Sequence, residues 1–316
     1  MPDPDGRVTL WGIEVFLAAA EEGSISAAAR RLGVSASAVS QQLSGLESTL
    51  GCQLLDRSTR PVRMTTSGTM FRRHAQTMLN AAAEARAELS VAGLAGLTTL
   101  RLGMIEDFDA DVTPRLLSLL ADELKNCRFL LETGASHRLL DQLDARALDM
   151  VVTADFGADL PVDIEWREMH PLMAEPFVAV TPKGVGADEL PLIQYTARHL
   201  MGRQIAAHLT RVGIRQAHRF ELDSYPAILA MVAAGKGWKI LTPLALHQAR
   251  TFRAKVDVHA LPFAPLERTL SLYSRAGVLQ DMPQHVANHL KRLIGSEILQ
   301  PALSHWPWMQ PALRVL

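Results

Sequence analysis

The chain has 316 residues, of which 48% are hydrophobic and 21% are charged. This length allows about two domains of roughly 100 to 200 residues each, and the composition is that of a globular protein rather than a disordered one. The 32 basic and 33 acidic residues leave a net charge of −1. The charge excludes a uniformly basic nucleic-acid-binding protein, so any contact with nucleic acid must come from a local basic patch.

The cysteines, the histidines and the N-terminus exclude several other classes. Cys52 and Cys127 form no CxxC motif, which argues against a disulfide scaffold and is consistent with the reducing cytoplasm. The eleven histidines are scattered along the chain, so we expect no metal site and no cofactor. Residues 1–7 lack a basic signal-peptide start, and no run of 18 apolar residues is free of charge or proline. We therefore expect a cytoplasmic protein with no membrane contact.

The N-terminal region predicts three short helices. Apolar residues recur at helical spacing from Ile13 to Ala20, and Gly23 ends that helix. Ser26 is the expected N-cap of a second helix at 27–32, and Ser35 that of a third. The third helix has two faces: one is apolar and the other is polar, small and nearly uncharged, with Ser37, Ser40, Gln41, Ser44 and Ser48. Short polar side chains allow close approach to the major groove, and Gln can bind adenine through two hydrogen bonds.

Charge for phosphate contacts lies beside this helix. Residues 24–73 hold seven arginines against Glu47 and Asp56, a local charge of +5 in a neutral chain. The segment LLDRSTRPVRMT contains two short β-prone pieces around a turn and predicts a wing, with Arg60 placed to enter a minor groove. Each serine or arginine taken alone is equally compatible with a helical bundle whose polar faces are only hydrated.

The next segments predict a long helix and then two α/β lobes. Residues 65–94 contain no proline and have apolar residues, among them Phe71, Met78 and Leu89, at spacings of three and four, with Gly93 and Gly96 as a stop and joint. Short apolar runs then alternate with helical patterns. We expect strands at 100–105, 129–132, 149–154, 177–180, 192–195, 220–222 and 238–241, and helices at 112–124, 137–143, 198–209 and 226–234.

The segment GSISAAARRLGVSASAVSQQLSGLESTLGCQLLDRSTRPVRMTTSG, from Gly23 to Gly68, closely resembles the DNA-binding domain of LysR-type transcriptional regulators. The resemblance implies an α/β protein with an all-α/winged-helix N-terminal domain, and two lobes of the type II periplasmic-binding-protein-like fold. The expected divisions are a winged helix-turn-helix at 1–65, a linker dimerisation helix at 66–95, an effector-binding domain at 96–298 with lobe II at about 174–265, and a C-terminal tail at 299–316.

The resemblance also implies partners and contact residues. The partners would be double-stranded DNA, a small-molecule effector and further copies of the chain in a homodimer or homotetramer. The family's recognition-helix positions fall on Ala36, Ser37, Ser40 and Gln41, and its wing arginines on Arg57, Arg60 and Arg63. With the neighbouring polar and basic residues, the DNA-binding set is Arg30, Arg31, Ser35, Ala36, Ser37, Ser40, Gln41, Ser44, Arg57, Arg60 and Arg63. Two residues depart from the family pattern: Leu55 replaces the usual Phe, and Asp56 adds an acid beside the wing.

The effector would lie where strands end and helices begin, because helix N-termini point their amides there. The candidate residues are Ile105, Glu106, Asp107, Phe108, Thr133, Gly134, Ser136, Thr153, Asp155, Tyr195, Thr196, Arg198, Asp223, Ser224 and Trp238. Hydroxyls such as Thr133, Ser136 and Thr196 suit a carboxylate.

The acidic segment EDFDAD favours a cationic group, with Phe108 or Trp238 as cation–π partners, so we expect a small zwitterion such as an amino acid or betaine. Alternatively, Asp109 and Asp111 cap the next helix, or Glu106 and Asp107 pair with an arginine such as Arg198 or Arg203.

The favoured function is a ligand-responsive transcriptional regulator and not an enzyme. The alternative, an enzyme fused to a DNA-binding domain, would need a catalytic motif, and residues 100–295 contain no GxSxG, GxxxxGK[ST] or GxGxxG. In the tail, Trp306 and Trp308 lie among prolines that disfavour a regular helix. We expect both rings to pack on a lobe or on a neighbouring subunit, since two exposed indoles would leave much apolar surface in water.

Overall fold

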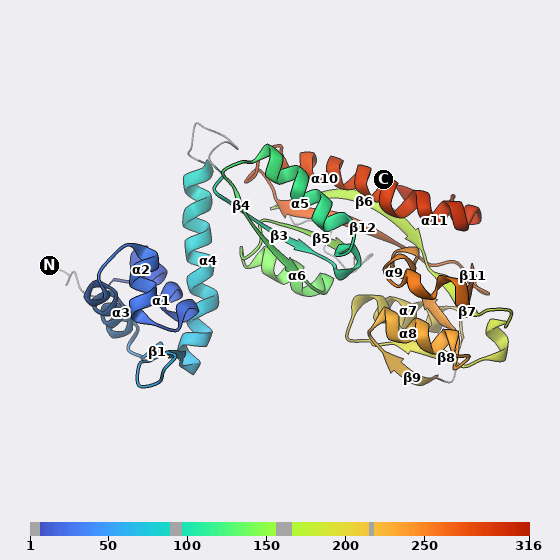
Figure 1. Ribbon diagram of the computed structural model, residues 1–316, viewed down its shortest axis with the longest axis horizontal. Coiled ribbons are helices and arrows are strands. Elements are labelled where there is room, and N and C mark those ends of the chain that lie inside the picture. The colour runs from blue at the N-terminus through green and yellow to red at the C-terminus, as the bar shows by residue number, and fades with distance from the viewer. Residues whose placement is uncertain (1–6, 89–96, 156–165, 215–217) are drawn as a thin grey trace. The chain divides into compact units, whose positions relative to one another are not determined.

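A computed structural model describes residues 7–88, 97–155, 166–214 and 218–316 (Figure 1). The chain divides into two compact units, residues 1–91 with 145–147, and residues 92–144 with 148–316. The predicted joint at Gly93 and Gly96, and Leu89 of the predicted apolar stripe, lie outside the described residues. No helix in the described part of the chain is long and apolar enough to cross a membrane.

The N-terminal unit begins with three capped helices. They are α1 (Leu10–Glu22), α2 (Ile25–Leu32) and α3 (Ala36–Leu50). The side chains of Thr9, Ser24 and Ser35 each accept a hydrogen bond from the backbone N–H three residues on, which satisfies one free donor of each first turn. Helix α2 therefore starts at Ile25, and its N-cap is Ser24 rather than the predicted Ser26.

A wing and a long helix complete this unit. Strands β1 (Leu55–Asp56) and β2 (Arg63–Met64) pair antiparallel, and α4 spans Thr66–Glu88. The first turns of α4 pack on the helical core, because the ring of Phe71 lies 5.5 Å from that of Phe16 and Ala75 is fully buried. A Cβ on Gly68 would lie 2.0 Å from the Leu54 carbonyl oxygen, so only glycine allows this close approach. Phe71 thus packs within its own unit.

Lobe I of the second unit is built on a six-stranded sheet. The strand order is β13-β6-β12-β5-β3-β4. Strands β3 (Thr99–Met104), β4 (Arg128–Thr133) and β5 (Met150–Ala154) are parallel, and β6 (Arg167–Pro176), β12 (Glu267–Arg275) and β13 (Arg314–Val315) add antiparallel pairs. Helices α5 (Val112–Glu123) and α10 (Met282–Leu293) lie on one face of the sheet and α6 (Ser136–Asp144) on the other (Figure 1).

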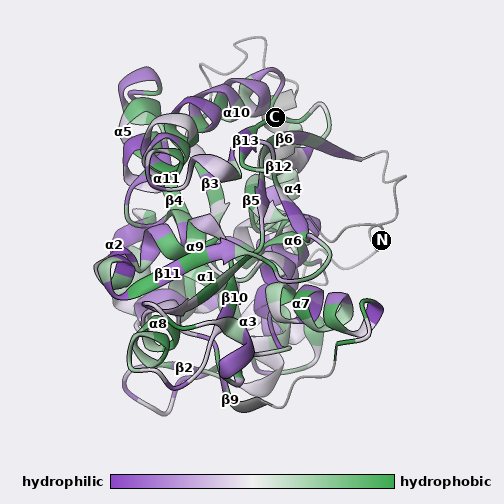
Figure 2. Ribbon diagram, turned by 90° about the vertical axis from the view of Figure 1, so that its right-hand side faces the viewer, coloured by the Kyte–Doolittle hydropathy of each residue, from purple (hydrophilic) through white to green (hydrophobic). Residues whose placement is uncertain are grey.

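Lobe II has two smaller sheets. Strand β7 (Val178–Pro182) lies between β10 (Lys239–Leu241) and β11 (Val256–Ala260), and β8 (Leu192–Tyr195) pairs in parallel with β9 (His218–Leu222). The helices of lobe II are α7 (Leu200–Arg211), α8 (Tyr225–Ala233) and α9 (Pro243–Gln248). Short 3-10 helices include η3 (Glu106–Phe108) in lobe I and η6 (Arg250–Lys255) in lobe II. Figure 2 shows hydrophobic and hydrophilic colour on different sides of helices such as α5 and α10, as an amphipathic pattern requires.

The chain passes between the lobes along two strands that the sequence analysis missed, β6 and β12. Strand β6 leads through Phe177 into β7 of lobe II, and β12 returns the chain to lobe I after β11. Pro171 obscured β6, because a proline inside a run argues against a central strand. The structure accommodates it at a register shift, where Ser271 pairs with Pro171 and Leu270 with Met173.

The C-terminal residues form part of lobe I. Helix α10 continues through a π-helical turn (Ile294–Leu299) into α11 (Gln300–His305), so the expectation of an irregular tail was wrong for its first half. Pro301 follows directly after this π-helical turn, where the regular hydrogen-bond pattern of the helix is already interrupted. Trp306 packs against the core, whereas Trp308 remains 44% exposed, so only one indole packs as predicted. The chain then joins the sheet as β13, and the N–H of Leu316 donates to the Leu172 oxygen at 3.0 Å.

This packing predicts the effect of two substitutions near the C-terminus. Leu313 is 1% exposed and Val315 is 38% exposed. Leu313→Ala should lower the free energy of unfolding by about 2–5 kcal/mol, as for other buried leucines, whereas Val315→Ala should change it by less than about 0.5 kcal/mol. Urea unfolding of both variants measures the difference. Equal effects would show that the C-terminal segment does not contribute to the core of lobe I.

Candidate functional site

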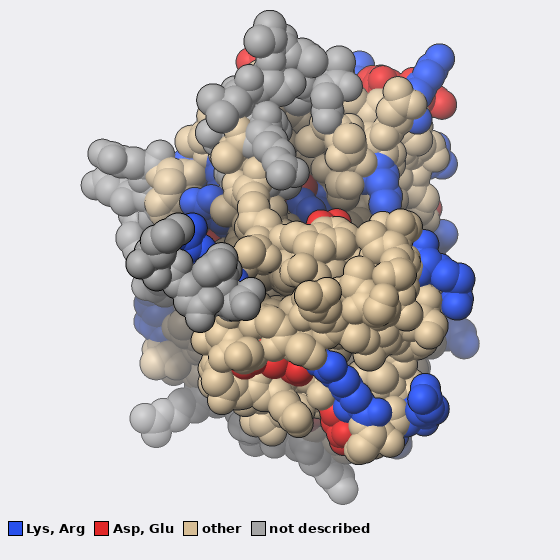
Figure 3. All heavy atoms as spheres, turned by 90° about the vertical axis from the view of Figure 1, so that its left-hand side faces the viewer, with Lys and Arg blue, Asp and Glu red and all other residues tan. Residues whose placement is uncertain are grey.

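The predicted DNA-contacting residues lie on the exposed side of α3. Val39, Leu43 and Leu46 are buried against α1 and α2, and Ser37, Gln41 and Ser44 are exposed. The Ser35 hydroxyl already makes two contacts within the protein, because it caps α3 and lies 2.9 Å from the Ser37 hydroxyl. Figure 3 shows the side of this unit, with uncharged side chains in the middle of the face and basic ones mainly toward its margins.

The predicted arginines divide into paired and unpaired groups. Arg31 donates to Glu21 at 2.7 Å and lies 3.3 Å from Glu22, and both acids lie just before the stretch whose charge was counted as +5. Arg57 pairs with Glu47 at 2.5 Å. The wing arginine Arg63 lies opposite Asp56 in the β1–β2 register. Hydrogen bonds from Ser58 are the main cause that lowers the pKa of the Asp56 carboxyl, and the charge of Arg63 lowers it further.

Arg30 and Arg60 are exposed and have no ion pair among the described residues. The charge of these two arginines is therefore available for phosphate. Ala36 and Ser40 complete the predicted set, and Ala36 is the first residue of α3.

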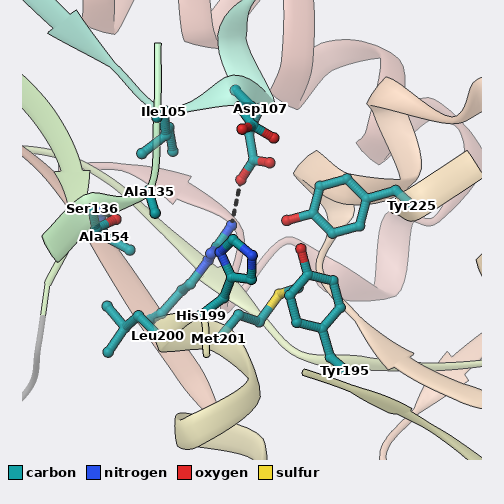
Figure 4. Close-up of a pocket in the computed structure, with 13 residues that line it drawn as sticks. Ile105, Asp107, Ala135, Ser136, Ala154, Tyr195, His199, Leu200, Met201 and Tyr225 are labelled. Atoms are coloured by element: carbon teal, nitrogen blue, oxygen red, sulfur yellow. Dashed lines mark hydrogen bonds and ion pairs between the residues drawn. The ribbon is translucent and has the colours of Figure 1, made fainter. Parts of the chain in front are cut away.

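A cavity lies between the two lobes of the second unit (Figure 4). About 60 Å³ of it accepts the centre of a water molecule, which is room for only a few waters. It is bounded by the end of β3 and by the N-terminal ends of α6, α7 and α8, whose free amides make such ends favourable for anions. The lining residues are Ile105, Glu106, Asp107, Gly134, Ala135, Ser136, Ala154, Tyr195, His199, Leu200, Met201, Tyr225 and Arg268.

A buried arginine, Arg268, is part of the cavity lining. Nη2 of Arg268 donates to Asp107 at 3.1 Å and lies 2.6 Å from Glu175, and Nε donates to Glu175 at 2.7 Å. The Arg268 and Asp107 side chains are 4% and 7% exposed, and Glu175 is fully buried. The other Glu175 oxygen accepts the N–H of Leu244 at 3.0 Å, at the start of α9. The network therefore links η3, β6, β12 and α9.

This network changes the charge expected at the cavity. Asp107 does pair with an arginine, but the partner is Arg268, which the sequence analysis did not single out, rather than Arg198 or Arg203. Burial raises the pKa of Glu175 despite Arg268 beside it, and the two carboxylates raise the pKa of Arg268 above its ordinary value even though burial opposes this. Glu106 is exposed and has no ion pair in the part of the chain that the structure describes.

Two tyrosines form the lobe II wall. The Tyr195 hydroxyl donates to the backbone oxygen of Asp223 at 2.9 Å. The Tyr195 and Tyr225 rings lie 5.6 Å apart, and their hydroxyls face one another (Figure 4). Burial raises the pKa of Tyr195 to about 12 and that of Tyr225 well above its usual value. Both phenols are therefore neutral near pH 7. The single proton of Tyr195 goes to Asp223, so Tyr225 is the phenol that can donate to a ligand, and the Tyr195 oxygen can accept.

The structure brings only part of the predicted effector set together. Ile105, Glu106, Asp107, Gly134, Ser136 and Tyr195 line the cavity. The Ser136 hydroxyl also accepts the N–H of Ala154 at 3.1 Å. Sequence reasoning missed His199 and Arg268; the alternation of ERTLSLYSR could have revealed the strand that carries Arg268.

The other predicted residues have structural contacts elsewhere. Phe108, Thr153 and Trp238 are at most 1% exposed, so neither aromatic ring can face a ligand cation as expected. Asp155 accepts from Ser271 and Tyr273, Thr133 donates to Asp109, Thr196 is buried, and Ser224 occupies the N-cap position of α8. Arg198 is 82% exposed and lies 3.8 Å from Asp223.

The alternative capping role for the acidic segment is also not observed. Asp111 occupies the N-cap position of α5 but makes no side-chain capping bond. It instead pairs with His247 at 2.8 Å and Arg250 at 3.0 Å. Asp109 accepts from Thr133 at 3.1 Å, and burial raises its pKa.

Comparison with known proteins identifies relatives of both units. Residues 10–69 match the family model for the bacterial regulatory helix-turn-helix protein of the lysR family, and residues 96–293 match the LysR substrate binding domain. A probable hydrogen peroxide-inducible genes activator of Mycobacterium avium is 32% identical over 231 residues, 68% of this chain and 71% of that protein. The regulator DgdR of Burkholderia cepacia is 30% identical over 233 residues, 73% and 76% of the two chains.

Among solved structures, the fold is similar to that of a full-length OxyR variant from Pseudomonas aeruginosa. The TM-score is 0.67 at 22% identity, covering 90% of this chain and 95% of that one.

The pairing of the arginines predicts how two variants bind DNA. Arg60→Ala should weaken binding to all sequences and lower the slope of log K against log salt by about one unit, because one phosphate contact is lost. Arg31→Ala is the matched control and should change the slope less, since Glu21 and Glu22 already neutralise Arg31. Fluorescence anisotropy across a salt series measures both slopes. Equal slopes for Arg60→Ala and the unmodified protein would remove the wing tip from the DNA interface.

Proposed function

Because the chain belongs to the LysR family of DNA-binding transcriptional regulators, we propose that its DNA binding responds to a small zwitterion in the cavity between its lobes. The family acts on DNA and not as an enzyme, so the alternative of a fused catalytic domain is set aside. For DNA, we propose that α3 reads bases through Ser37, Ser40 and Gln41, with phosphates held by Arg30 and Arg60.

The observation that carries the effector proposal is that the cavity lining combines a helix N-terminus with a carboxylate that has no ion pair. Gly134 and Ala135 lead into α6, whose first residue is Ser136, and this helix N-terminus suits a carboxylate. Glu106 offers a carboxylate with no ion pair among the described residues. Asp107 is compensated by Arg268, so we assign one acidic contact for a ligand cation and not two.

The size and the remaining walls support a ligand of few atoms. The cavity accepts only a few waters, which favours a molecule such as a small amino acid or betaine over a long or aromatic one. Tyr225 adds a neutral hydrogen-bond donor, and the Tyr195 hydroxyl, whose proton goes to Asp223, adds an acceptor. Trp238 and Phe108 supply no cation–π contact, so the cation in this proposal depends on Glu106.

Peroxide is the alternative effector, because relatives are named hydrogen peroxide-inducible genes activators. A sensor that forms a disulfide needs two reactive thiols. Residues 96–316 contain one cysteine, Cys127, and burial together with Asp149 raises its pKa, which lowers its reactivity. Cys52 lies beyond the end of α3 in the other unit. We therefore favour reversible binding of a small molecule over thiol oxidation.

Calorimetry on the full-length protein tests this proposal. The panel contains small amino acids, glycine betaine, and mono- and dicarboxylates of matched size. We expect a zwitterion to bind, and Glu106→Gln to weaken it at least about tenfold, which corresponds to about 1.4 kcal/mol. Asp188→Asn removes an exposed acid of lobe II away from the cavity and should leave the affinity unchanged.

Two results would contradict the proposal. One is preferred binding of a plain carboxylate, and the other is an affinity that Glu106→Gln does not alter. In a separate arm, a change in operator binding after hydrogen peroxide treatment, abolished by Cys127→Ser, would favour the thiol alternative.

A further inference from the structure

Two histidines and a glutamate converge on the outer face of lobe I, apart from the effector cavity. His285 and His289 lie one helical turn apart on α10, so their side chains project from the same face. Glu123 is the last residue of α5, which packs beside α10. Among the described residues this is the one group of three such side chains whose ligand atoms all lie within 4.8 Å of one another.

The three distances are close to the edges of a metal coordination shell. Nε2 of His285 lies 2.7 Å from one Glu123 oxygen, Nε2 of His289 lies 3.0 Å from the other, and the two Nε2 atoms are 3.0 Å apart. Ligands at about 2.0–2.1 Å from a tetrahedral Zn²⁺ are separated by about 3.3 Å. These contacts involve both Glu123 oxygens, so an ion would take both oxygens of the carboxylate, or one of them after the carboxylate turns. One ligand atom from each residue already lies within 4.8 Å of the others.

Hydrogen bonds alone cannot satisfy this arrangement. If both Nε2 atoms carry a proton and donate to Glu123, the two N–H groups meet donor to donor at 3.0 Å. If one Nε2 lacks its proton, its lone pair faces the carboxylate oxygen instead. A divalent cation removes the conflict, because it accepts a lone pair from each of the three atoms.

The surroundings are suited to a cation with one open coordination position. The C-terminal end of α5 carries the partial negative charge of the helix dipole beside Glu123. The His289 side chain is 6% exposed, whereas those of His285 and Glu123 are 48% and 40% exposed, so water can reach the site. Imidazole ligands favour zinc and its neighbours over Mg²⁺ or Ca²⁺.

We propose that Glu123, His285 and His289 form a binding site for a divalent transition-metal ion such as Zn²⁺, completed by water, which joins α5 to α10. The expectation of no metal site overlooked the spacing of His285 and His289, four residues apart in the sequence.

One neighbour opposes the ion. Nη2 of Arg292 lies 2.9 Å from Nδ1 of His289, so it donates there and leaves the imidazole proton on Nε2, the atom that must bind the metal. Arg292 is exposed and can turn away when Nδ1 takes up that proton. Arg292→Gln replaces this competing donor by an amide oxygen that can accept from Nδ1–H, an outer contact that strengthens metal ligation.

Metal titration of the full-length protein, freed of metal by a chelator, tests the site. Co²⁺ is the spectroscopic probe and Zn²⁺ the competitor. We expect one equivalent of Co²⁺ to give the visible absorption of a four- or five-coordinate ion, displaced by Zn²⁺. Glu123→Gln and His285→Gln should each weaken binding at least about tenfold, and Arg292→Gln should strengthen it, by analogy with other outer contacts.

His259→Gln is the matched control, because it removes an exposed histidine from β11 of lobe II. It should leave the Co²⁺ spectrum and the affinity unchanged. Circular dichroism without metal should show all variants folded, since the replaced side chains are partly exposed. The assignment would be overturned if the Co²⁺ spectrum persisted in Glu123→Gln and His285→Gln. It would also be overturned if these variants bound Co²⁺ as tightly as the unmodified protein does.

Discussion

The buried guanidinium of Arg268 is the interaction on which the arrangement of the two lobes depends. It contacts Asp107 of η3 in lobe I and Glu175 at the end of β6, and Glu175 in turn binds the first turn of α9. An unpaired charge in this position would cost several kcal/mol. The three charged side chains therefore hold their elements close enough for the charges to compensate one another. The Arg268–Glu175 contact also joins β6 and β12, the strands that pass between the lobes, where they leave the sheet of lobe I.

This constraint also determines the chemistry of the cavity. Asp107 lies at the cavity wall, but its charge is compensated from behind by Arg268. The helix N-termini line the cavity together with the neutral phenols of Tyr195 and Tyr225, and Glu106 is a lining acid with no ion pair among the described residues. This distribution is the basis of the proposal that a small zwitterion binds in preference to a dicarboxylate, because the helix N-termini favour one carboxylate and Glu106 would repel a second.

The local elements could be predicted from the sequence, and the network could not. Helical spacing identified the three N-terminal helices and α4, and short apolar runs identified β3 to β5. Strand β6 was not predicted because Pro171 lies inside it. The partners of Arg268, Asp107 and Glu175, lie 161 and 93 positions away in the sequence, so no local pattern predicts these contacts. The histidine spacing on α10 was readable, but Glu123 lies 162 residues before His285. Trp238 illustrates the same limit, since a ring predicted at the ligand is fully buried in lobe II.

A double-mutant cycle on Asp107 and Arg268 tests the central claim most directly. Urea unfolding, followed by tryptophan fluorescence, gives the free energy of unfolding for Asp107→Asn, Arg268→Met and the double variant. Arg268→Met alone leaves Asp107 and Glu175 without their cation and should cost about 3–5 kcal/mol. If the pair acts as described, the double variant should be less destabilised than the sum of the single variants, with a coupling of at least about 1 kcal/mol. Effects that add within about 0.5 kcal/mol would contradict the account, because Asp107 and Arg268 would then contribute independently.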